Sequence, residues 1–536
     1  MFRNKTSIFF LLLLLIISAI LHFISLDWGA PFFFHPDERN IAYAVSALTF
    51  PYRMNPHFFA YGSLPLYSVY LIGLLAGRGV PTVSFSDAVL IGRLISATLA
   101  TMLIPLVYLV GKRLADRRTG FNAALLTTLS VGIIQFAHFS TFEMWLTFFS
   151  LLLFWFCLRL QDAQNRRNLA LSTGVVLGIL VAIKISSIVF IPLPLLLLFL
   201  QKTRREEKWR FILKNTALSC LILATAGAVY LATNPYVFLD YASFRNSIGY
   251  ETSVALGTLP VFYTQAFSGT TPGIFQLFHV FPFLLNPFGE IVGIFSLVYL
   301  LVQASKKRQA SIILLLIFFL LLALPPAVLF VKWTRYMVPA VPFIYLMIAL
   351  ALRPVPPATA KNTLRRGTLG ALILTSGIFS FAFIRTVYLT PDTRLQALSW
   401  ARNHLPPNTA ILSETYDLGI VPFNSFFPNI TLFNFYAMDQ IPSQQVVLSQ
   451  KLASADAVIL PSQRVLKPRL LRPSLFPLSG QFYHNLVSGN LGFSKAYQTP
   501  CDVWCTILYL GSPIFTYEET ATVFDRPVVT IYRRRL

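Results

Sequence analysis

Long runs of apolar residues with very few charges recur along this chain. A run of about 20 apolar residues is long enough to cross the hydrocarbon core of a bilayer as one helix. The first run covers residues 7–26. The segment that follows it is bulky and acidic and offers no small-residue cleavage site, so we expect this helix to be retained. With a mean hydropathy of +0.65, the repeated runs exclude a soluble globular protein and predict a polytopic α-helical membrane protein.

Eleven such runs are candidate membrane spans, and the basic residues between them indicate which side each connection faces. The candidate spans are 7–26, 94–111, 119–137, 144–158, 169–183, 185–200, 215–233, 288–305, 309–331, 336–352 and 367–384. Lys and Arg gather on cytoplasmic connections. The basic clusters are Arg3 with Lys5, 112–118, 165–167, 202–210, 306–308 and 353–366, and they fall on alternate connections. This order predicts a multi-pass protein of the plasma membrane with a cytoplasmic N-terminus and an extracytoplasmic C-terminal part.

Two apolar stretches need a special arrangement. If residues 64–77 crossed the membrane, the basic cluster at 112–118 would move to the outer side, so we expect them to lie along the outer leaflet as a juxtamembrane segment. Residues 169–200 have basic clusters on both flanks. Two short helices with a break near Lys184 resolve this conflict and place Lys184 at the outer interface, where a long cationic side chain reaches the headgroups.

The charge and the cysteines narrow the classes of partner and compartment. The net charge of +22 is accounted for by the cytoplasmic clusters of a multi-pass protein, so we expect membrane lipids and no nucleic acid as partners. Cys157 and Cys220 lie in apolar runs and are expected to be small buried hydrophobes. Cys501 and Cys505 lie in a polar segment, and they can form a local disulfide if that segment faces an oxidising compartment.

The chain after the last span is more polar than the part before it. It has helical periodicity in TRLQALSWARNHL and strand-like alternation in ADAVILPS and VVTIYRR. We therefore expect two domains, a transmembrane domain at 1–387 and an extracytoplasmic α/β domain at 388–536.

Carboxylates beside apolar segments on the predicted outer face are candidate functional residues. Asp37 and Glu38 lie between FFF and AYAVSAL, where unpaired charge is costly. His138 and Glu143 lie at the second predicted outer turn. Carboxylates and imidazoles gathered at one interface suit a general base or a shared divalent cation, for which Asp37 and Glu143 are the candidate ligands.

Basic residues on the predicted outer side go against the topological preference for the cytoplasm. The candidates are Arg93, Lys184, Lys332 and Arg335. Contact with lipid phosphates accounts for part of this set. A basic group that faces the outer carboxylates suits, instead, a phosphate-bearing ligand at the interface. A base and a phosphate clamp at one membrane surface, with or without a metal ion, are suited to group transfer from a lipid-phosphate donor.

An ordered set of motifs resembles those of the GT-C glycosyltransferases, and among them the prokaryotic relatives of protein O-mannosyltransferases and aminoarabinose transferases. In the membrane part the motifs are HPDE (35–38), YGSLPLYSVYL (61–71), AHFSTFEMWLTFF (137–149), GVVLGILVAIKISS (174–187), NPYVFLDYASF (234–244), YTQAFSGTTP (263–272) and VKWTRYMVPAVPF (331–343). In the C-terminal part they are TRLQALSWARNHLPPNTAILSETYD (393–417), SADAVILPSQRV (454–465), GNLGFSKAY (489–497) and EETATVFDRPVVTIY (518–532). Each motif alone is weak, but the ordered set covers most of the chain and is specific.

The resemblance implies a GT-C fold with about 11 transmembrane helices and outer juxtamembrane helices. It implies inverting transfer of a sugar from a polyprenyl-phosphate carrier to a protein, glycan or lipid acceptor outside the membrane. It carries the role of general base onto Asp37, with Glu38 as its neighbour. Contact with the carrier phosphate maps onto Lys184 and Arg335, with Lys332 as a weaker member.

Two positions depart from the pattern of the resemblance. Many relatives have Asp where this chain has Glu143, so the acceptor or metal role of Glu143 stays open. Relatives commonly have Asp-His-Pro at residues 525–527, where this chain has Asp-Arg-Pro, which argues for a structural role of that motif. The alternative function is a lipid or sugar transporter or flippase without transferase activity. The acidic residues gather at one interface and no internal repeat is apparent, and both observations favour the transferase.

Overall fold

The computed structural model describes residues 2–77, 80–160, 166–200, 208–354, 360–441 and 443–535, without the side chains of residues 2–7 and 307. Five of the predicted basic clusters lie partly outside the described residues. These parts are the side chains of Arg3, Lys5 and Lys307, and residues 165, 202–207 and 355–359.

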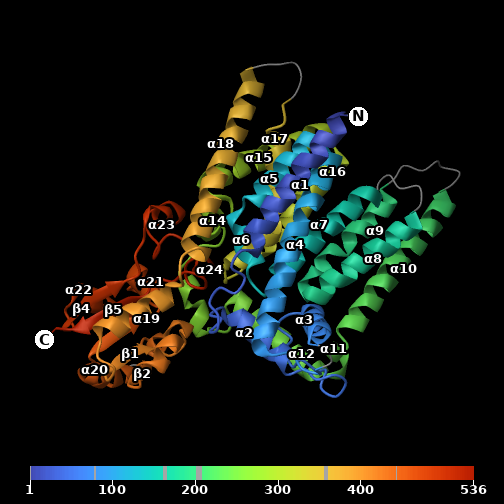
Figure 1. The fold of residues 1–536 in the computed structure, drawn as a ribbon. Coiled ribbons are helices and arrows are strands. Elements are labelled where there is room, and N and C mark those ends of the chain that lie inside the picture. Colours follow the sequence, from blue (N-terminus) through green and yellow to red (C-terminus); the bar gives the residue numbers. More distant parts are fainter. Residues whose placement is uncertain are drawn as a thin grey trace.

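The larger part of the molecule is a bundle of long helices (Figure 1). They are α1 (Phe2–Phe23), α4 (Phe85–Leu114), α7 (Glu143–Leu160), α8 (Arg166–Ile183), α10 (Lys208–Thr233), α15 (Pro287–Lys307), α16 (Ala310–Val328), α17 (Val341–Ala351) and α18 (Ala360–Phe383). Within the described ranges, eight helical segments are long and apolar enough to cross a membrane, or nine if a bent pair of helices counts as one span. All eight coincide with predicted spans. The chain is therefore a multi-pass helical membrane protein, as the sequence predicts.

The other three predicted spans are shorter or broken. Residues 119–137 form α5 (Arg117–Thr128) and α6 (Val131–Ala137), which meet at 60°. Residues 185–200 form η1 (Ile185–Phe190) and α9 (Pro192–Phe199), and the described apolar part of α1 is Ile8–Phe23. The total of eleven spans stays a prediction.

The helix break near Lys184 is present and is fixed by close packing. Helix α8 ends at Ile183, and Lys184 directly precedes η1. A Cβ atom on Gly174 or on Gly178 would lie 2.7 Å from a backbone oxygen of α10. These two glycines, four residues apart, let the backbones of α8 and α10 approach closely, as small residues do between membrane helices. This contact sets the position of the end of α8 and therefore of Lys184.

Short helices gather at one end of the bundle, opposite the N-terminus of α1 (Figure 1). They include α2 (Pro36–Ser46), α3 (Ser63–Ala76), α11 (Tyr236–Leu239) and α12 (Tyr241–Leu256). The short helix η4 (Thr334–Ala340) contacts α2 through an ion pair between Arg335 and Asp37. The connection from α12 to α15 forms η3 (Phe262–Phe267), α13 (Ile274–His279) and α14 (Phe281–Leu285). Helix α3 is the segment that the sequence assigns to the outer leaflet, and its 14 residues are fewer than a span requires.

The C-terminal part lies beside this end of the bundle and contains a five-stranded sheet (Figure 1). The strands are β1 (Ile411–Glu414), β2 (Ile430–Phe433), β3 (Ala457–Leu460), β4 (Phe493–Gln498) and β5 (Thr530–Arg534), in the order β2-β1-β3-β5-β4. Strand β1 is parallel to β2 and β3, and β5 is antiparallel to β3 and β4. The helices are α19 (Thr393–His404), η6 (Leu418–Ser425), η7 (Phe435–Ala437), α20 (Gln444–Ser454), α21 (Leu466–Leu471), α22 (Pro477–Ser488), α23 (Val503–Leu508) and α24 (Glu519–Thr522). The predicted α/β architecture of this part is confirmed.

The C-terminal part is joined to the last long helix through the chain itself and through an aromatic contact. The short π-helix η5 (Ile384–Tyr388) continues α18 toward α19. Cys501 and Cys505 form a disulfide, which the sequence allowed. It encloses Trp504, whose ring lies against that of Phe381 on α18 with centroids 4.8 Å apart.

Candidate active site

Asp37 forms an ion pair with Arg335, which lies 298 residues further along the chain. Asp37 lies in the first turn of α2, and His35 caps this helix by accepting a hydrogen bond from the Glu38 amide at 3.4 Å. Arg335 lies on η4, with its guanidinium 4.4 Å from the ring centre of Trp333. The side chains of Asp37 and Arg335 are 23% and 17% exposed, respectively. The pair is therefore held firmly but stays accessible.

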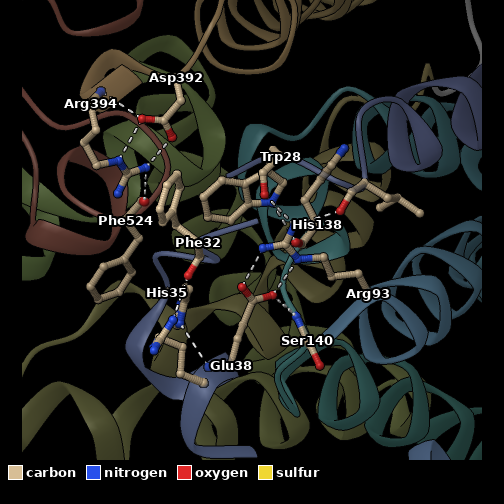
Figure 2. A network of polar contacts seen from close by, with 12 residues as sticks. Trp28, Phe32, His35, Glu38, Arg93, His138, Ser140, Asp392, Arg394 and Phe524 are labelled. Atoms are coloured by element: carbon tan, nitrogen blue, oxygen red, sulfur yellow. Dashed lines mark hydrogen bonds and ion pairs between the residues drawn. The ribbon is translucent and has the colours of Figure 1, made fainter. Parts of the chain in front are cut away.

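Glu38, the next residue, forms a completely buried ion pair with Arg93 (Figure 2). The guanidinium donates two parallel hydrogen bonds to the carboxylate, at 2.7 and 2.8 Å. Its remaining nitrogen donates to the carbonyls of Leu26 and Trp28, and the Ser140 amide donates to Glu38 at 2.6 Å. This bidentate geometry is the arrangement in which a buried pair satisfies its hydrogen-bonding groups. The network joins α2, α4 and the turn before α7.

Glu38 and Arg93, for which the sequence predicts roles in catalysis and in carrier-phosphate binding, are buried against each other. Both side chains have no exposed area, and every Arg93 nitrogen already donates to a protein oxygen. A Cβ atom on Gly92 would lie 1.8 Å from the Ser140 hydroxyl, so the Arg93 segment is packed directly against the turn. A carrier phosphate cannot reach Arg93, and Glu38 has no free oxygen at an accessible surface. We assign this pair a structural role.

His138 also has a structural environment. Its two ring nitrogens lie 2.7 Å from the carbonyl oxygens of Ile134 and Ile24, and its ring stacks on Tyr388 at 3.9 Å. The Trp28 indole donates to the His138 carbonyl at 3.1 Å (Figure 2). Because both nitrogens are used by backbone carbonyls, the expected metal or acceptor role of His138 is not supported.

Glu143 lies close to the Asp37–Arg335 pair. It is the first residue of α7 and is buried, and its carboxylate interacts electrostatically with Arg335 and Asp37. Its two oxygens accept no hydrogen bond of normal geometry from the part of the chain that the structure describes. Asp37, Glu143 and Arg335 are thus brought together from three separate elements.

A cavity of about 440 Å³ lies beside the ion pair. Its described lining contains three charged residues, Lys184, Glu251 and Arg335. Most of the remaining wall is apolar and includes Leu146, Leu180, Val189, Phe190 and Leu321. One cavity thus offers an apolar surface and a small set of charged groups, which is typical of a ligand site.

Lys184 reaches this cavity between two aromatic rings. Its ammonium lies 5.1 Å from the ring centre of Phe142 and 4.8 Å from that of Tyr336, which is favourable for a cation. A Cβ atom on Gly62 would lie 1.8 Å from the Ala182 carbonyl oxygen, so only glycine lets the loop before α3 pack on the end of α8. Lys184 and Arg335 are therefore the two predicted phosphate ligands that line the same cavity.

Lys332, the weaker of the predicted phosphate ligands, does not line this cavity. Its ammonium donates to the Phe330 carbonyl at 2.6 Å and lies over the rings of Phe267 and Phe330. Burial, with a smaller contribution from repulsion by Arg472, lowers its pKa to about 8. Lys332 therefore packs against Phe267 in the connection between α12 and α15 and is not placed to bind a carrier phosphate in the cavity.

Two further residues of the site were not singled out from the sequence. Glu251 on α12 is the acidic residue of the cavity lining, and burial raises its pKa while Arg335 opposes this shift. Tyr61 accepts a hydrogen bond from Arg335 at 3.4 Å. The available signal for Glu251 was that the predicted outer loop contains just one other acid, Asp240. No periodic pattern indicates that Glu251 faces Arg335, because these residues are far apart in the sequence.

The residues fit a divalent cation poorly as they are arranged. Among the described residues, no group of three or more His, Cys, Asp or Glu side chains could hold a metal ion. Asp37 and Glu143 remain as two carboxylates, and Arg335 is bound to Asp37. A cation at this place would have to displace the guanidinium.

Comparison with known proteins agrees with this architecture. A family model described as dolichyl-phosphate-mannose-protein mannosyltransferase matches residues 84–231, well under half of the chain. A search of curated proteins found no match.

Solved structures show the fold of the whole chain. The oligosaccharyltransferase of Archaeoglobus fulgidus in its apo form is 13% identical, with a TM-score of 0.55 over 99% of this chain and 89% of that one. The same enzyme tethered to an acceptor peptide with an NVT sequon is 12% identical, with a TM-score of 0.53 over 90% of this chain and 72% of that one. Its complex with Zn and sulfate is 14% identical, with a TM-score of 0.50 over 98% of this chain and 88% of that one. The predicted GT-C fold, a helical membrane bundle with a C-terminal domain, is confirmed.

Proposed function

We propose that this chain is an inverting glycosyltransferase that moves a sugar from a polyprenyl-phosphate carrier to an acceptor on the outer face of the membrane. The observation that carries the proposal is the Asp37–Arg335 ion pair, whose Arg335 lines a largely apolar cavity together with Lys184. The match of residues 84–231 to the dolichyl-phosphate-mannose-protein mannosyltransferase family supports a lipid-phosphate sugar donor.

The cavity suits the carrier in both of its parts. The apolar wall accommodates a prenyl chain, and the cations of Lys184 and Arg335 meet an anionic phosphate. Phosphate binding competes with Asp37 for the Arg335 guanidinium. The donor therefore loosens the ion pair when it binds, and a carboxylate is left beside the sugar.

The chemical step is a single displacement. The acceptor hydroxyl gives its proton to Asp37, and its oxygen forms a bond to the anomeric carbon. The bond between that carbon and the phosphate oxygen breaks, and its electron pair leaves with the phosphate, which Lys184 and Arg335 stabilise. Attack opposite the leaving phosphate inverts the anomeric centre, and no covalent sugar intermediate forms on the protein.

The acceptor and a metal ion are the open parts of this proposal. One solved relative was tethered to an acceptor peptide and also crystallised with Zn. In this chain Asp37 and Glu143 are the carboxylates that a divalent cation would need, and it could bind them only if Arg335 left Asp37. A chelator titration of the transfer reaction tests this: loss of transfer that Mg²⁺, Mn²⁺ or Zn²⁺ restores supports the metal, and full transfer contradicts it.

We propose that the end of the bundle with the active site faces outward from the plasma membrane. Helix α2 and the C-terminal domain lie toward that end, opposite the N-terminus of α1 (Figure 1). Helix α2 carries Asp37, which pairs with Arg335. The Cys501–Cys505 disulfide in the C-terminal domain suits an oxidising compartment. The basic residues at 112–118 favour the cytoplasm for the other end.

Transfer by the purified protein tests the proposal. The protein in detergent or liposomes is given a radiolabelled polyprenyl-phosphate sugar and a panel of hydroxyl acceptors of peptide, glycan and lipid type. We expect label to move to one acceptor class and free prenyl phosphate to appear. The transporter alternative predicts movement of intact donor across liposomes with no release of prenyl phosphate, and that result would reject the transferase.

A further inference from the structure

Glu518 of the C-terminal domain binds the segment that contains Arg335. Its carboxylate accepts hydrogen bonds from the Thr334 amide at 3.0 Å and from the Thr334 hydroxyl at 2.7 Å. The same oxygen accepts from the Thr520 amide at 3.1 Å, so Glu518 also caps the start of α24. Glu518 and Thr334 are 2% and 0% exposed. The contact is a buried, charge-assisted link between the two parts of the chain.

Thr334 is the first residue of η4, and Arg335 follows it directly. Fixing the amide and the side chain of Thr334 fixes the direction in which the backbone enters η4. The Arg335 side chain starts from this point and reaches Asp37. Hydrogen bonds to a carboxylate are among the stronger ones in proteins. Glu518 is therefore placed to determine where the guanidinium lies.

The C-terminal domain also contacts the Asp37 side of the ion pair. The Phe524 ring packs against His35, the N-cap of α2, with centroids 4.4 Å apart (Figure 2). Arg394 donates to the Phe524 carbonyl at 3.0 Å, and its guanidinium lies 3.7 Å from the ring centre of Phe34. The C-terminal domain thus contacts the start of η4, next to Arg335, and the start of α2, next to Asp37.

We infer that the C-terminal domain positions the Asp37–Arg335 pair, and that Glu518 is a positioning residue for the transfer reaction. The inference rests on the proposed function for its kinetic consequence. The contact itself is independent of that function. Glu518 touches neither the cavity lining nor the reacting groups and acts through Thr334 and Arg335.

Glu414 provides a matched control. It is also a buried carboxylate of the C-terminal domain, and it accepts hydrogen bonds from the amides of Tyr416 and Phe435. Both of these partners belong to its own domain. Removing Glu414 therefore weakens the domain without touching the link to Arg335.

The first test is hydrogen–deuterium exchange of the full-length protein in detergent. Glu518→Ala is expected to speed exchange of the amides in residues 330–340, whereas Glu414→Ala leaves that segment at the wild-type rate. Glu518→Gln keeps an oxygen that accepts from Thr334 and restores much of the protection. Unchanged exchange of 330–340 in Glu518→Ala would overturn the inference, whether or not the protein transfers sugar.

The second test is kinetic and separates positioning from folding. We expect Glu518→Ala to lower kcat/KM by more than about 10-fold, and Glu414→Ala to change it less than about 2-fold. In an Arg335→Gln background, Glu518→Ala should add almost nothing, because residues that act through one another are not additive. Full additivity of the two losses would contradict a role through Arg335. Absence of transfer in the wild type would reject the proposed function. The hydrogen–deuterium exchange result would then decide whether Glu518 positions the segment that contains Arg335.

Discussion

Arg335 binds Asp37 at an accessible surface, whereas Arg93 binds the neighbouring Glu38 with no exposed area on either side chain. Two consecutive acids in the first turn of α2 therefore have different roles. Consecutive positions of a helix are about 100° apart around its axis, so adjacent side chains face different surroundings. Asp37 reaches Arg335, which lines the cavity, whereas Glu38 lies in the packed interior.

The Glu38–Arg93 pair is predicted to contribute stability rather than catalysis. Removing one partner of a buried ion pair leaves the other charge uncompensated, which costs about 3–5 kcal/mol. We expect Glu38→Gln to lower the free energy of unfolding by roughly this amount, measured by thermal or denaturant unfolding in detergent.

The exposed ion pair of Arg353 with Asp116, with side chains 45% and 38% exposed, is the matched control for this measurement. Arg353→Gln is expected to cost no more than about 1 kcal/mol, because solvent screens such pairs. A Glu38→Gln protein as stable as the Arg353→Gln protein would contradict the structural role.

Lys184 and Lys332 are predicted to differ in donor binding. Lys184 lines the cavity, and Lys332 donates to a backbone carbonyl away from it. Loss of a hydrogen bond to a charged group costs about 1.5–3 kcal/mol, so Lys184→Met should weaken binding of undecaprenyl phosphate about 10- to 100-fold. Lys332→Met should leave this affinity near the wild-type value. Equal losses in a direct binding assay would reject the assignment of the cavity.

The stability of the C-terminal domain is predicted to fall as pH rises from about 4 to about 7. Burial raises the pKa of Asp525 from 3.8 to about 7, against the lowering effect of a hydrogen bond from Gln135. In this window the folded state binds the proton and the unfolded state does not, so each rise in pH favours unfolding.

The substitution Asp525→Asn removes this dependence because an amide does not titrate. The unfolding midpoints of the wild type and of Asp525→Asn are measured from pH 4 to pH 8. The two midpoints should be nearly equal at low pH and differ most at pH 8, where the variant should be the more stable protein. The difference has an upper limit of about 4 kcal/mol, since one pKa unit corresponds to about 1.4 kcal/mol. Parallel profiles for the two proteins would show that Asp525 does not titrate in this window.

The orientation in the membrane is predicted to place α22 outside and the end of α4 inside. Ser488 and Lys112 are exposed at these places. Ser488→Cys should react with an impermeant maleimide in intact cells, and Lys112→Cys only after lysis. Cys220→Ser is introduced in both proteins because Cys220 is exposed. The reverse labelling pattern would show that the active site faces the cytoplasm.

Most of the fold follows from local patterns of the sequence. Hydrophobic runs located the long helices, and the alternation in residues 457–460 and 530–534 located two strands that pair in the sheet. The basic clusters on both sides of residues 169–200 predicted the break at Lys184. If both clusters lie on the same side of the membrane, the segment between them must cross it an even number of times. The bend between α5 and α6 was missed, since its apolar run continues through the break.

The site was predicted less completely because its geometry depends on packing between distant segments. Asp37 and Arg335 were selected singly, and nothing in a run of residues indicates that they pair across the chain. Arg93 and Lys332 have the same residue types as the true lining residues, and only three-dimensional packing shows that their nitrogens are already bound. Glu251 was missed for the same reason.

The most direct test of the central claim compares wild type with Asp37→Asn in transfer of sugar from radiolabelled polyprenyl-phosphate donor. Asparagine keeps the shape of the side chain but cannot take up the proton of the acceptor hydroxyl. The account predicts a loss of kcat of at least about 100-fold, in line with general base catalysis. Affinity for undecaprenyl phosphate should be equal or higher, because Arg335 is released. Full transfer by Asp37→Asn would contradict the account.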